Sequence, residues 1–182
     1  MVFSALVIGQ VVFDYFDSKA DQNSKEQEEK VFYSSKFKRL QIESSEMNNQ
    51  SEGQNKNINL NFSNLKDKVV IINFWASWCK PCLEELPSLV SLKNKIDSDK
   101  LEILAINTDE DEQVKAVSKI IRKFKINFKV VYDRKDKFAE IFDVSAIPVT
   151  LIFIKSELYL IKRGQMDFFS EEIIDLIKQN IK

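Results

Sequence analysis

The two cysteines of the chain, Cys79 and Cys82, are its strongest candidates for chemistry. They are the only cysteines among 182 residues, and Lys80 and Pro81 separate them. A disulfide between them closes a very short loop, which stabilises a fold little. Side chains three positions apart on a helix return to the same face. The pair therefore predicts thiol–disulfide exchange, in which Cys79 attacks a disulfide and Cys82 resolves the mixed disulfide.

The composition excludes several other kinds of site. The sequence contains no histidine, so it has no Ser–His or Cys–His nucleophile pair and no histidine-ligated metal or haem. Two cysteines cannot form a four-cysteine zinc site. The formal net charge is −1, so no strong positive field attracts a nucleic acid, and nucleic-acid binding is not expected. Hydrophobic residues make up 44% of the chain, which is enough for a core.

The elements around the cysteines are predicted to activate the first of them. Val69–Phe74 is an apolar run broken only by Asn73, as expected of a strand buried on both faces. A helical pattern then runs from Cys79 to Ile96. At the start of a helix, free backbone N–H groups and the helix dipole favour a thiolate, and the positive charge of Lys80 adds to this, so both lower the pKa of Cys79. Pro81 fits the first helical turn.

The remaining pattern predicts an α/β fold. Further strands are expected at Leu101–Ile106, Phe128–Tyr132, Val149–Ile154 and Leu158–Ile161, the last two as an antiparallel hairpin. Helices are expected from Asp109 to Phe124, over Lys135–Phe142 and from Ser170 onward. This order predicts a central mixed β-sheet with helices on both faces and right-handed crossovers between its parallel strands.

Several residues near the cysteines have two interpretations. Ile147 and Pro148 stand at the head of a predicted strand; a cis bond would turn the Ile147 backbone toward a substrate segment beside Cys79, whereas a trans bond would only mark the strand start. Trp75 and Trp78 flank the site: Trp78 is the candidate for covering the thiol pair, and Trp75 the candidate for simple packing. Glu85 lies three residues after Cys82 and either relays protons to the buried thiol or is a solvated carboxylate of the first helical turns.

The N-terminus begins with an apolar run, Val2–Phe13, which is shorter than the roughly 20 residues of a spanning helix. It has the length of a signal-peptide hydrophobic region, although no Lys or Arg precedes it. We favour an export signal or membrane anchor at 1–16, with a buried N-terminal helix or strand as the alternative. A polar tether is expected at 17–35, followed by one domain at 36–182.

The start of that domain is predicted to contain an N-terminal β extension. Phe37–Ile42 and Ile58–Phe62 alternate between apolar and polar residues, as strands do. Between them, Ser44–Lys56 is rich in Ser, Asn, Gln and Glu and is expected to be a loop.

Four stretches of the sequence share their pattern with a known family. They are Asn73–Cys82 (NFWASWCKPC) with Glu85-Leu86-Pro87 behind it, Leu104–Asn107, Asn127–Asp133 and Val144–Thr150. Together they resemble the TlpA/ResA branch of the thioredoxin superfamily, whose members are extracytoplasmic bacterial thiol–disulfide oxidoreductases. The resemblance covers roughly Phe37 to Lys182 and implies a thioredoxin fold with a strand–helix insertion between Ile106 and Phe128.

The resemblance also implies roles for individual residues. Pro148 would be the family's cis-proline, and Trp78 and Ile147 would lie with it in the substrate-binding surface. Glu85 matches the glutamate that this branch carries near its resolving cysteine. Asn73 stands where thioredoxins proper carry a buried aspartate, so Glu85 takes over the proton role.

The resemblance further implies protein substrates with disulfides and a membrane electron donor in the bacterial periplasm or at the extracytoplasmic face. Cytochrome c maturation or envelope redox control would be the process. Membrane contact through the N-terminal segment and a monomeric chain are expected. No cofactor is needed, because the sulfurs carry the electrons themselves.

Four alternatives remain open at this stage. The pair could act as a disulfide oxidant or isomerase instead of a reductant. Peroxide reduction is disfavoured because Cys79 has no Thr and Arg nearby in sequence. A copper chaperone would use the soft thiolates but lacks a third ligand such as histidine. A catalytically idle interaction module is disfavoured by the intact cysteine pair.

Overall fold

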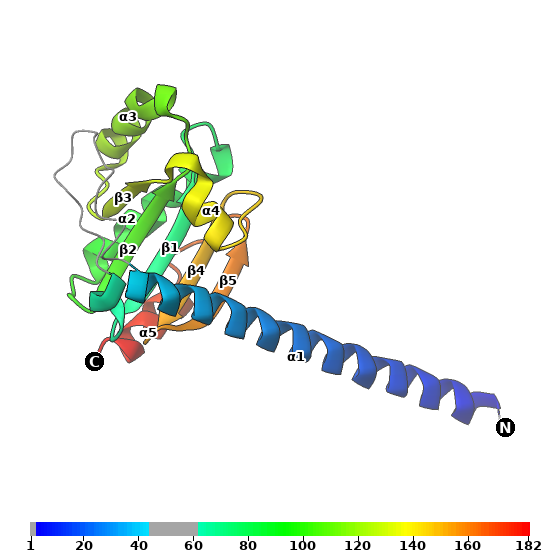
Figure 1. The fold of residues 1–182 in the computed structure, drawn as a ribbon. Coiled ribbons are helices and arrows are strands. Elements are labelled where there is room, and N and C mark those ends of the chain that lie inside the picture. The colour runs from blue at the N-terminus through cyan, green and yellow to red at the C-terminus, as the bar shows by residue number, and fades with distance from the viewer. Residues whose placement is uncertain (1–2, 44–61) are drawn as a thin grey trace.

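The structure is a computed structural model, and it describes residues 3–43 and 62–182. Its centre is one five-stranded mixed sheet (Figure 1). The strands are β1 (Val69–Trp75), β2 (Leu101–Asn107), β3 (Lys129–Tyr132), β4 (Val149–Ile154) and β5 (Glu157–Arg163). They lie in the order β3-β2-β1-β4-β5, with β1, β2 and β3 parallel and β4 antiparallel to both β1 and β5.

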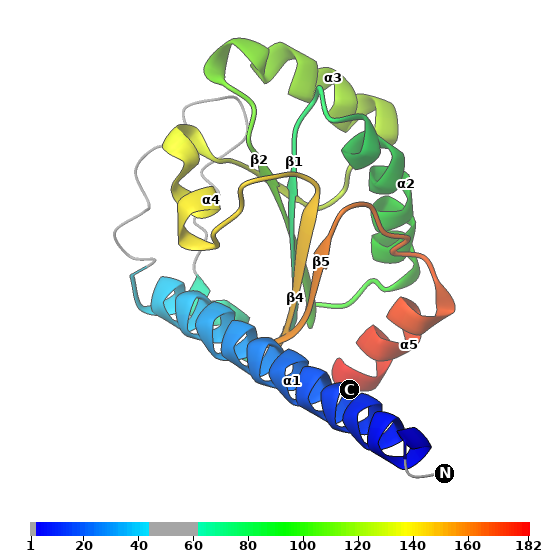
Figure 2. The same ribbon diagram turned by 90° about the vertical axis from the view of Figure 1, so that its right-hand side faces the viewer.

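Helices cover both faces of the sheet, as predicted (Figure 2). The α-helices are α1 (Phe3–Glu43), α2 (Lys80–Lys95), α3 (Val114–Phe124), α4 (Lys137–Ile141) and α5 (Glu171–Asn180), and short 3-10 helices occupy Phe62–Leu65, Asp111–Gln113 and Arg134–Asp136. One apolar cluster joins α1 and α4 to the sheet, and a second joins α2 and α5 to the opposite face. The predicted α/β architecture is confirmed.

Strand β1 is the centre of both clusters. All seven of its residues are buried. Val70, Ile72 and Phe74 belong to the cluster under α1, whereas Val69 and Ile71 belong to the cluster under α2. Successive side chains of a strand point to opposite faces, so a strand covered on both sides needs apolar residues throughout. This explains the continuous apolar run and makes the polar Asn73 within it unusual.

The β4–β5 hairpin forms at the place that the sequence predicts. Lys155 and Ser156 both have positive φ angles, of 50° and 70°. Two such residues form the tight turn whose twist matches the twist of antiparallel strands.

The N-terminal segment differs from the prediction. Phe37–Ile42 is not a strand: it lies inside α1, so that expectation is wrong. Tyr33, Phe37 and Leu40 are buried at spacings of four and three, which is one face of a helix. The Phe37 ring stacks on Phe153 of β4 with 4.3 Å between ring centroids. Burial of this helical face outweighs the local alternation that suggested a strand.

The rest of the predicted β extension lies largely outside the described residues. This holds for the loop Ser44–Lys56 and for 58–61 of the second predicted strand, while Phe62 opens a 3-10 helix. The described residues therefore contain no strand before β1. Between β2 and β3 the regular elements are helical, namely the 3-10 helix at 111–113 and α3. Strand β3 then forms the edge of the sheet.

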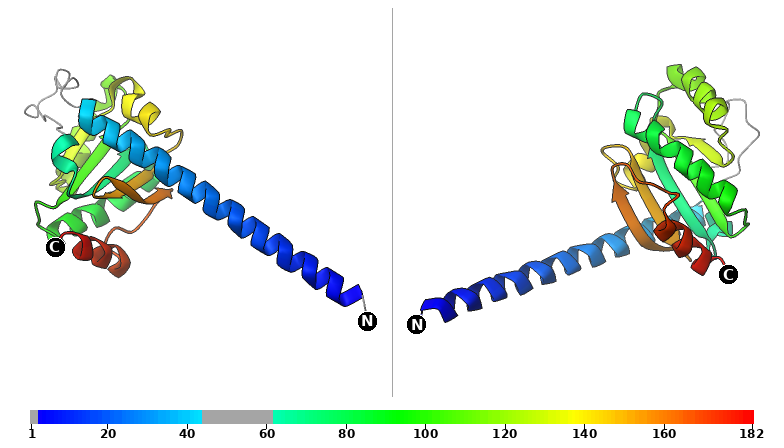
Figure 3. Two further views of the ribbon diagram at one scale, coloured as in Figure 1. Left: turned by 60° about the horizontal axis from the view of Figure 1, so that its bottom comes forward. Right: turned by 180° about the vertical axis from the view of Figure 1, so that it is seen from behind.

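Helix α1 passes through both predicted boundaries, at 16/17 and 35/36, without a break. Its last third docks on β5, where the Leu158 N–H donates to Ser34 Oγ at 2.8 Å and Arg163 pairs with Glu29 at 2.8 Å. Its earlier part extends away from the domain (Figure 3). Within 3–43 and 62–182, no helix is long and apolar enough to cross a membrane. The division into leader, tether and domain stays a prediction.

Candidate active site at the Cys79–Cys82 disulfide

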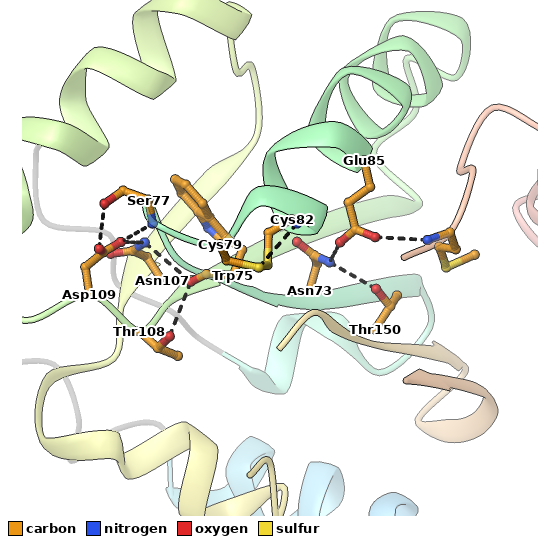
Figure 4. Close-up of a disulfide and its surroundings, with 11 residues drawn as sticks. Asn73, Trp75, Ser77, Cys79, Cys82, Glu85, Asn107, Thr108, Asp109 and Thr150 are labelled. Atoms are coloured by element: carbon orange, nitrogen blue, oxygen red, sulfur yellow. Dashed lines mark hydrogen bonds between the residues drawn. A yellow bond between two sulfur atoms is a disulfide. The ribbon is translucent and has the colours of Figure 1, made fainter. Parts of the chain in front are cut away.

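The two cysteines form a disulfide where β1 leads into α2 (Figure 4). Their sulfurs are 2.02 Å apart and their Cα atoms 5.3 Å apart. The pair belongs to a third buried cluster, which includes Trp75 at the end of β1 and Val117 of α3. The strand–turn–helix context predicted around the cysteines is therefore present.

Cys79 is the N-cap residue of α2. The backbone N–H of Cys82 donates to Cys79 Sγ at 3.3 Å, and Pro81 occupies the first turn. A backbone N–H aimed at this sulfur, at the positive end of the helix dipole, favours negative charge on Cys79 after reduction. The Lys80 side chain is largely exposed, with Nζ 3.8 Å from Glu84 Oε1, so its charge is shared with a neighbouring carboxylate in solvent.

The two sulfurs differ in access. Cys79 is 5% exposed and Cys82 is fully buried, so Cys79 is the one that an incoming group can reach first. Trp78 is 64% exposed beside it, whereas Trp75 is completely buried. Ile147 packs against the cluster that contains both cysteines, and its bond to Pro148 is cis. Of the three predicted substrate-binding residues, Trp78 is thus exposed next to Cys79 and Ile147 packs on the cysteine cluster, whereas Pro148 is buried.

A buried carboxylate lies on one side of the disulfide. Glu85 is 1% exposed and accepts hydrogen bonds from Asn73 Nδ2 at 2.7 Å and from the Met166 backbone N–H at 3.0 Å. Burial raises the pKa of Glu85, and these two hydrogen bonds partly oppose the rise. Glu85 is therefore not a solvated carboxylate. Its raised pKa brings it closer to the range in which it can exchange a proton with a thiol.

Strand pairing holds this carboxylate in place. Asn73 of β1 stands directly opposite Thr150 of β4, and Asn73 Nδ2 also donates to Thr150 Oγ1 at 3.0 Å. We call Asn73, Glu85, Thr150 and the Met166 backbone the Glu85 cluster. Sequence reasoning missed Thr150 and Met166. Only the facing positions of two strands could have identified Thr150, and no local signal identifies Met166.

The segment after β5 connects this cluster to the cis-proline. Gly164, with a φ of 91°, donates its N–H to the Pro148 carbonyl at 2.8 Å. Two residues later, Met166 donates to Glu85, and Phe168 N–H donates to Ser88 Oγ of α2 at 3.1 Å. A positive φ suits glycine, which explains its presence at this turn. The segment therefore hydrogen-bonds to Pro148, to Glu85 and to helix α2.

A second carboxylate, Asp109, lies on the other side of the disulfide (Figure 4). It accepts hydrogen bonds from Ser77 N–H at 2.7 Å, from Ser77 Oγ at 2.7 Å and from Asn107 Nδ2 at 2.6 Å. The Thr108 N–H also donates to the Trp75 carbonyl at 3.0 Å. We call Ser77, Asn107 and Asp109 the Asp109 cluster. It holds the loop that ends at Cys79 against the end of β2.

Sequence reasoning treated Asp109 only as a helix start. It lies two residues beyond β2, and β2 runs parallel to β1 with Trp75 opposite Asn107. The carboxyl ends of two parallel neighbours meet at one edge of the sheet, so this position was a signal that could have identified it.

Family and structure comparisons agree with this geometry. The family model described as the AhpC/TSA family matches residues 41–159. The chain belongs to the AhpC/TSA family. It is 34% identical over 93 residues to the thiol-disulfide oxidoreductase ResA of Bacillus subtilis, which covers 51% of each chain. It is 33% identical over 121 residues to ResA of Geobacillus kaustophilus, which covers 66% of this chain and 67% of that one. The predicted resemblance to ResA is confirmed.

Solved structures support the fold. StoA from Bacillus subtilis is 27% identical with a TM-score of 0.51, and the match covers 64% of this chain and 84% of that one. A thiol:disulfide interchange protein of the thioredoxin family from Chlorobium tepidum, 23% identical, shares the fold with a TM-score of 0.55 over 63% of this chain and 83% of that one. The match to the Bacillus subtilis ResA spans about half of that protein's length.

Among the described residues, no group of three or more His, Cys, Asp or Glu side chains could hold a metal ion. The site offers the chemistry of two sulfurs, of which that of Cys79 is accessible and that of Cys82 is buried. Beside them, the Glu85 cluster holds a carboxylate whose pKa is raised.

Proposed function

We propose that this protein is an extracytoplasmic thiol–disulfide oxidoreductase that reduces protein disulfides. The observation that carries the proposal is the disulfide at the start of α2, with Cys79 at the accessible side and Cys82 fully buried beside the Glu85 cluster. An exchange needs one sulfur that meets the substrate and a second that is protected until the mixed disulfide has formed. The ResA relatives, named thiol-disulfide oxidoreductases, support the same reaction class.

The reaction starts from the dithiol. The Cys79 thiolate attacks one sulfur of the substrate disulfide, which breaks that bond, forms a mixed disulfide and releases the other substrate sulfur as a thiolate that takes up a proton. Cys82 then loses its proton and attacks Cys79 Sγ, which restores the internal disulfide and releases the second substrate thiol. Two electrons and two protons pass to the substrate.

Each neighbouring residue has a role in this sequence. Glu85 accepts the Cys82 proton, because burial raises its pKa toward that of a thiol. The exposed Trp78, Ile147 and the cis-Pro148 form the surface that receives the substrate. Pro81 starts the helix, and Asn73 and Lys80 support the site.

The proposed direction of electron flow requires a source of electrons. A dithiol that reduces substrates outside the cytoplasm must be reduced again, which requires a membrane electron donor. We place the protein in the bacterial periplasm or on the extracytoplasmic face, as a monomer, in cytochrome c maturation or envelope redox control. The resemblance to the TlpA/ResA branch, whose members are extracytoplasmic, is what supports this setting.

A protein-disulfide reduction assay tests the reaction class. The purified protein with dithiothreitol as electron donor should accelerate insulin reduction, and both Cys79→Ser and Cys82→Ser should fall to the uncatalysed rate. Cys82→Ser should accumulate a mixed disulfide with the substrate, whereas Cys79→Ser should not. No acceleration by the intact protein, or a mixed disulfide through Cys82, would contradict the proposal. Peroxide consumption by the reduced protein would instead favour a peroxidase.

The reduction potential of the Cys79–Cys82 pair tests the direction. A value near about −250 mV or lower supports a reductant. A value near about −120 to −180 mV would indicate an oxidant or isomerase. A pair that stays reduced in the titration and binds Cu(I) tightly and stoichiometrically would indicate a copper chaperone.

A further inference from the structure

Asn73 has one polar atom that its surroundings do not use. Its side chain is fully buried, and Nδ2 donates to Glu85 Oε1 at 2.7 Å and to Thr150 Oγ1 at 3.0 Å. Its carbonyl oxygen, Oδ1, accepts no hydrogen bond from the described residues. A buried acceptor without a donor destabilises a fold, so an asparagine in an otherwise apolar strand needs a reason.

The orientation of the Asn73 carboxamide is determined by its neighbours. Nδ2 supplies both of its hydrogen atoms to oxygen atoms, one of them a carboxylate oxygen. A reversed carboxamide would place Oδ1 against Glu85 Oε1, which is repulsive when Glu85 is ionised. Oδ1 therefore points away from Glu85, and Figure 4 shows the carboxamide between the Glu85 carboxylate and the Cys79–Cys82 disulfide.

A disulfide sulfur carries no hydrogen, so the oxidised pair cannot donate to Oδ1. Reduction adds two electrons and two protons, breaks the S–S bond and leaves Cys82 as a buried thiol with one S–H. We propose that Asn73 Oδ1 accepts a hydrogen bond from the Cys82 S–H in the reduced protein. Asn73 is then a positioning residue whose polar network is complete only in the dithiol state. This inference deepens the proposed function and rests on it.

The proposed hydrogen bond has two consequences. It stabilises the dithiol relative to the disulfide, so it makes the pair a weaker reductant than it would be without Asn73. It also orients the Cys82 S–H toward the Glu85 cluster, because Asn73 belongs to that cluster. A thiol is a weak donor, so the effect is modest.

Redox equilibrium against a reference dithiol tests the first consequence. Asn73→Leu has a similar shape but no polar atom, and we expect its equilibrium to shift about fivefold to tenfold toward the disulfide, where tenfold is about 30 mV. Thr150→Val removes the other partner of Asn73 Nδ2 and leaves Oδ1 untouched, so it should shift less than twofold. No shift in Asn73→Leu, or equal shifts in the two variants, would overturn the proposal.

The infrared S–H stretching band of Cys82 tests the hydrogen bond without relying on the folding of Asn73→Leu alone. In reduced Cys79→Ala, Cys82 is the single thiol of the chain. We expect its band at a lower frequency than that of a free thiol, and a return to the free-thiol frequency in Cys79→Ala/Asn73→Leu. A free-thiol frequency in Cys79→Ala itself would overturn the proposal. The reductase assay of the intact protein is independent of this band, so the two proposals fail separately.

Discussion

The Glu85 cluster and the Asp109 cluster lie on opposite sides of the same disulfide, and each is built around one carboxylate (Figure 4). The donors to Glu85 come from β1 and from the segment after β5. Two of the three donors to Asp109 belong to Ser77, in the loop that leads into Cys79. The surrounding elements thus fix the position of the Glu85 carboxylate, whereas the Asp109 carboxylate fixes the position of the loop before Cys79.

This difference separates two tasks that a redox site needs. Glu85 is buried with only two donors, so its pKa rises and it can exchange a proton. Asp109 is half-buried and accepts three hydrogen bonds, which fix the backbone before the helix. We infer that the Glu85 cluster controls protonation and the Asp109 cluster controls geometry.

The largest effect is expected when Glu85 is replaced. Glu85→Gln keeps the shape but removes the proton acceptor, so disulfide reduction at pH 7 should fall about a hundredfold, at the lower end of general-base contributions. The loss should shrink at pH 9, where hydroxide deprotonates Cys82 directly. Glu84→Gln, a half-exposed neighbour on the same helix, is the matched control and should change the rate little. An equal loss in both variants would contradict the assigned role.

A smaller effect, and a different kind of effect, is expected at Asp109. Asp109→Asn should lower the free energy of unfolding by about 2 kcal/mol, because hydrogen bonds to a charged group are lost or weakened. The shape of the pH–rate profile should stay that of the unmodified protein. Urea unfolding and a pH–rate series measure the two. Ser77→Ala, which removes one donor, should cost about 1 kcal/mol. A pH–rate profile that is shifted by Asp109→Asn would contradict the assignment of protonation to the Glu85 cluster alone.

The pH dependence of stability gives a third test. Since burial raises the pKa of Glu85 in the folded state, the folded protein binds its proton more tightly than the unfolded chain. The stabilisation of the folded state by this tighter proton binding is complete below the glutamate pKa of the unfolded chain. It is lost as pH rises through the pKa of Glu85 in the folded protein. Each unit of difference between the two pKa values is worth about 1.4 kcal/mol.

Stability of the protein relative to Glu85→Gln should therefore fall as pH rises through this window and level off above it. Asp133, whose pKa burial also raises, is present in both proteins, so its contribution cancels in the difference. Urea unfolding between pH 4 and 8 measures the difference. A constant difference across that range would mean that the Glu85 pKa is not raised.

The smallest expected effect is the coupling between the clusters. Within 3–43 and 62–182 they share no hydrogen-bond partner, so the changes in unfolding free energy caused by Asp109→Asn and Glu85→Gln should add in the double variant to within about 0.5 kcal/mol. A larger coupling energy would show that the disulfide region transmits strain between the two sides.

The parts of the site that were predictable are those encoded within one short segment. Cys79, Pro81 and Cys82 start a helix after a buried strand because each residue suits that position on its own. The contacts that complete the site join residues far apart: Asn73 to Thr150 over 77 positions, Glu85 to Met166 over 81 and Ser77 to Asp109 over 32. No local pattern determines which distant polar group meets a given side chain.

The N-terminal error has a different cause. The spacing of Tyr33, Phe37 and Leu40 was visible in the sequence as one helical face, but Phe37–Ile42 also alternates over a few residues. Over such a short stretch the two periods are hard to separate. What decides between them is the apolar surface that the sheet presents, including Phe153, and that surface is known only once the sheet is formed.

Helix α1 fixes the direction in which its N-terminal end lies relative to the domain. From Ser18 to Glu28 every side chain is exposed, yet the helix is continuous from Phe3 to its docking residue Tyr33. A flexible chain of about 30 residues has a root-mean-square span of about 30 Å and allows any heading. The same residues as a helix span about 45 Å along one line. A partner bound at the N-terminal end of α1 is therefore held at a fixed distance and in a fixed direction from the disulfide. That geometry, as well as the chemistry of the sulfurs, limits which partners can reach Cys79.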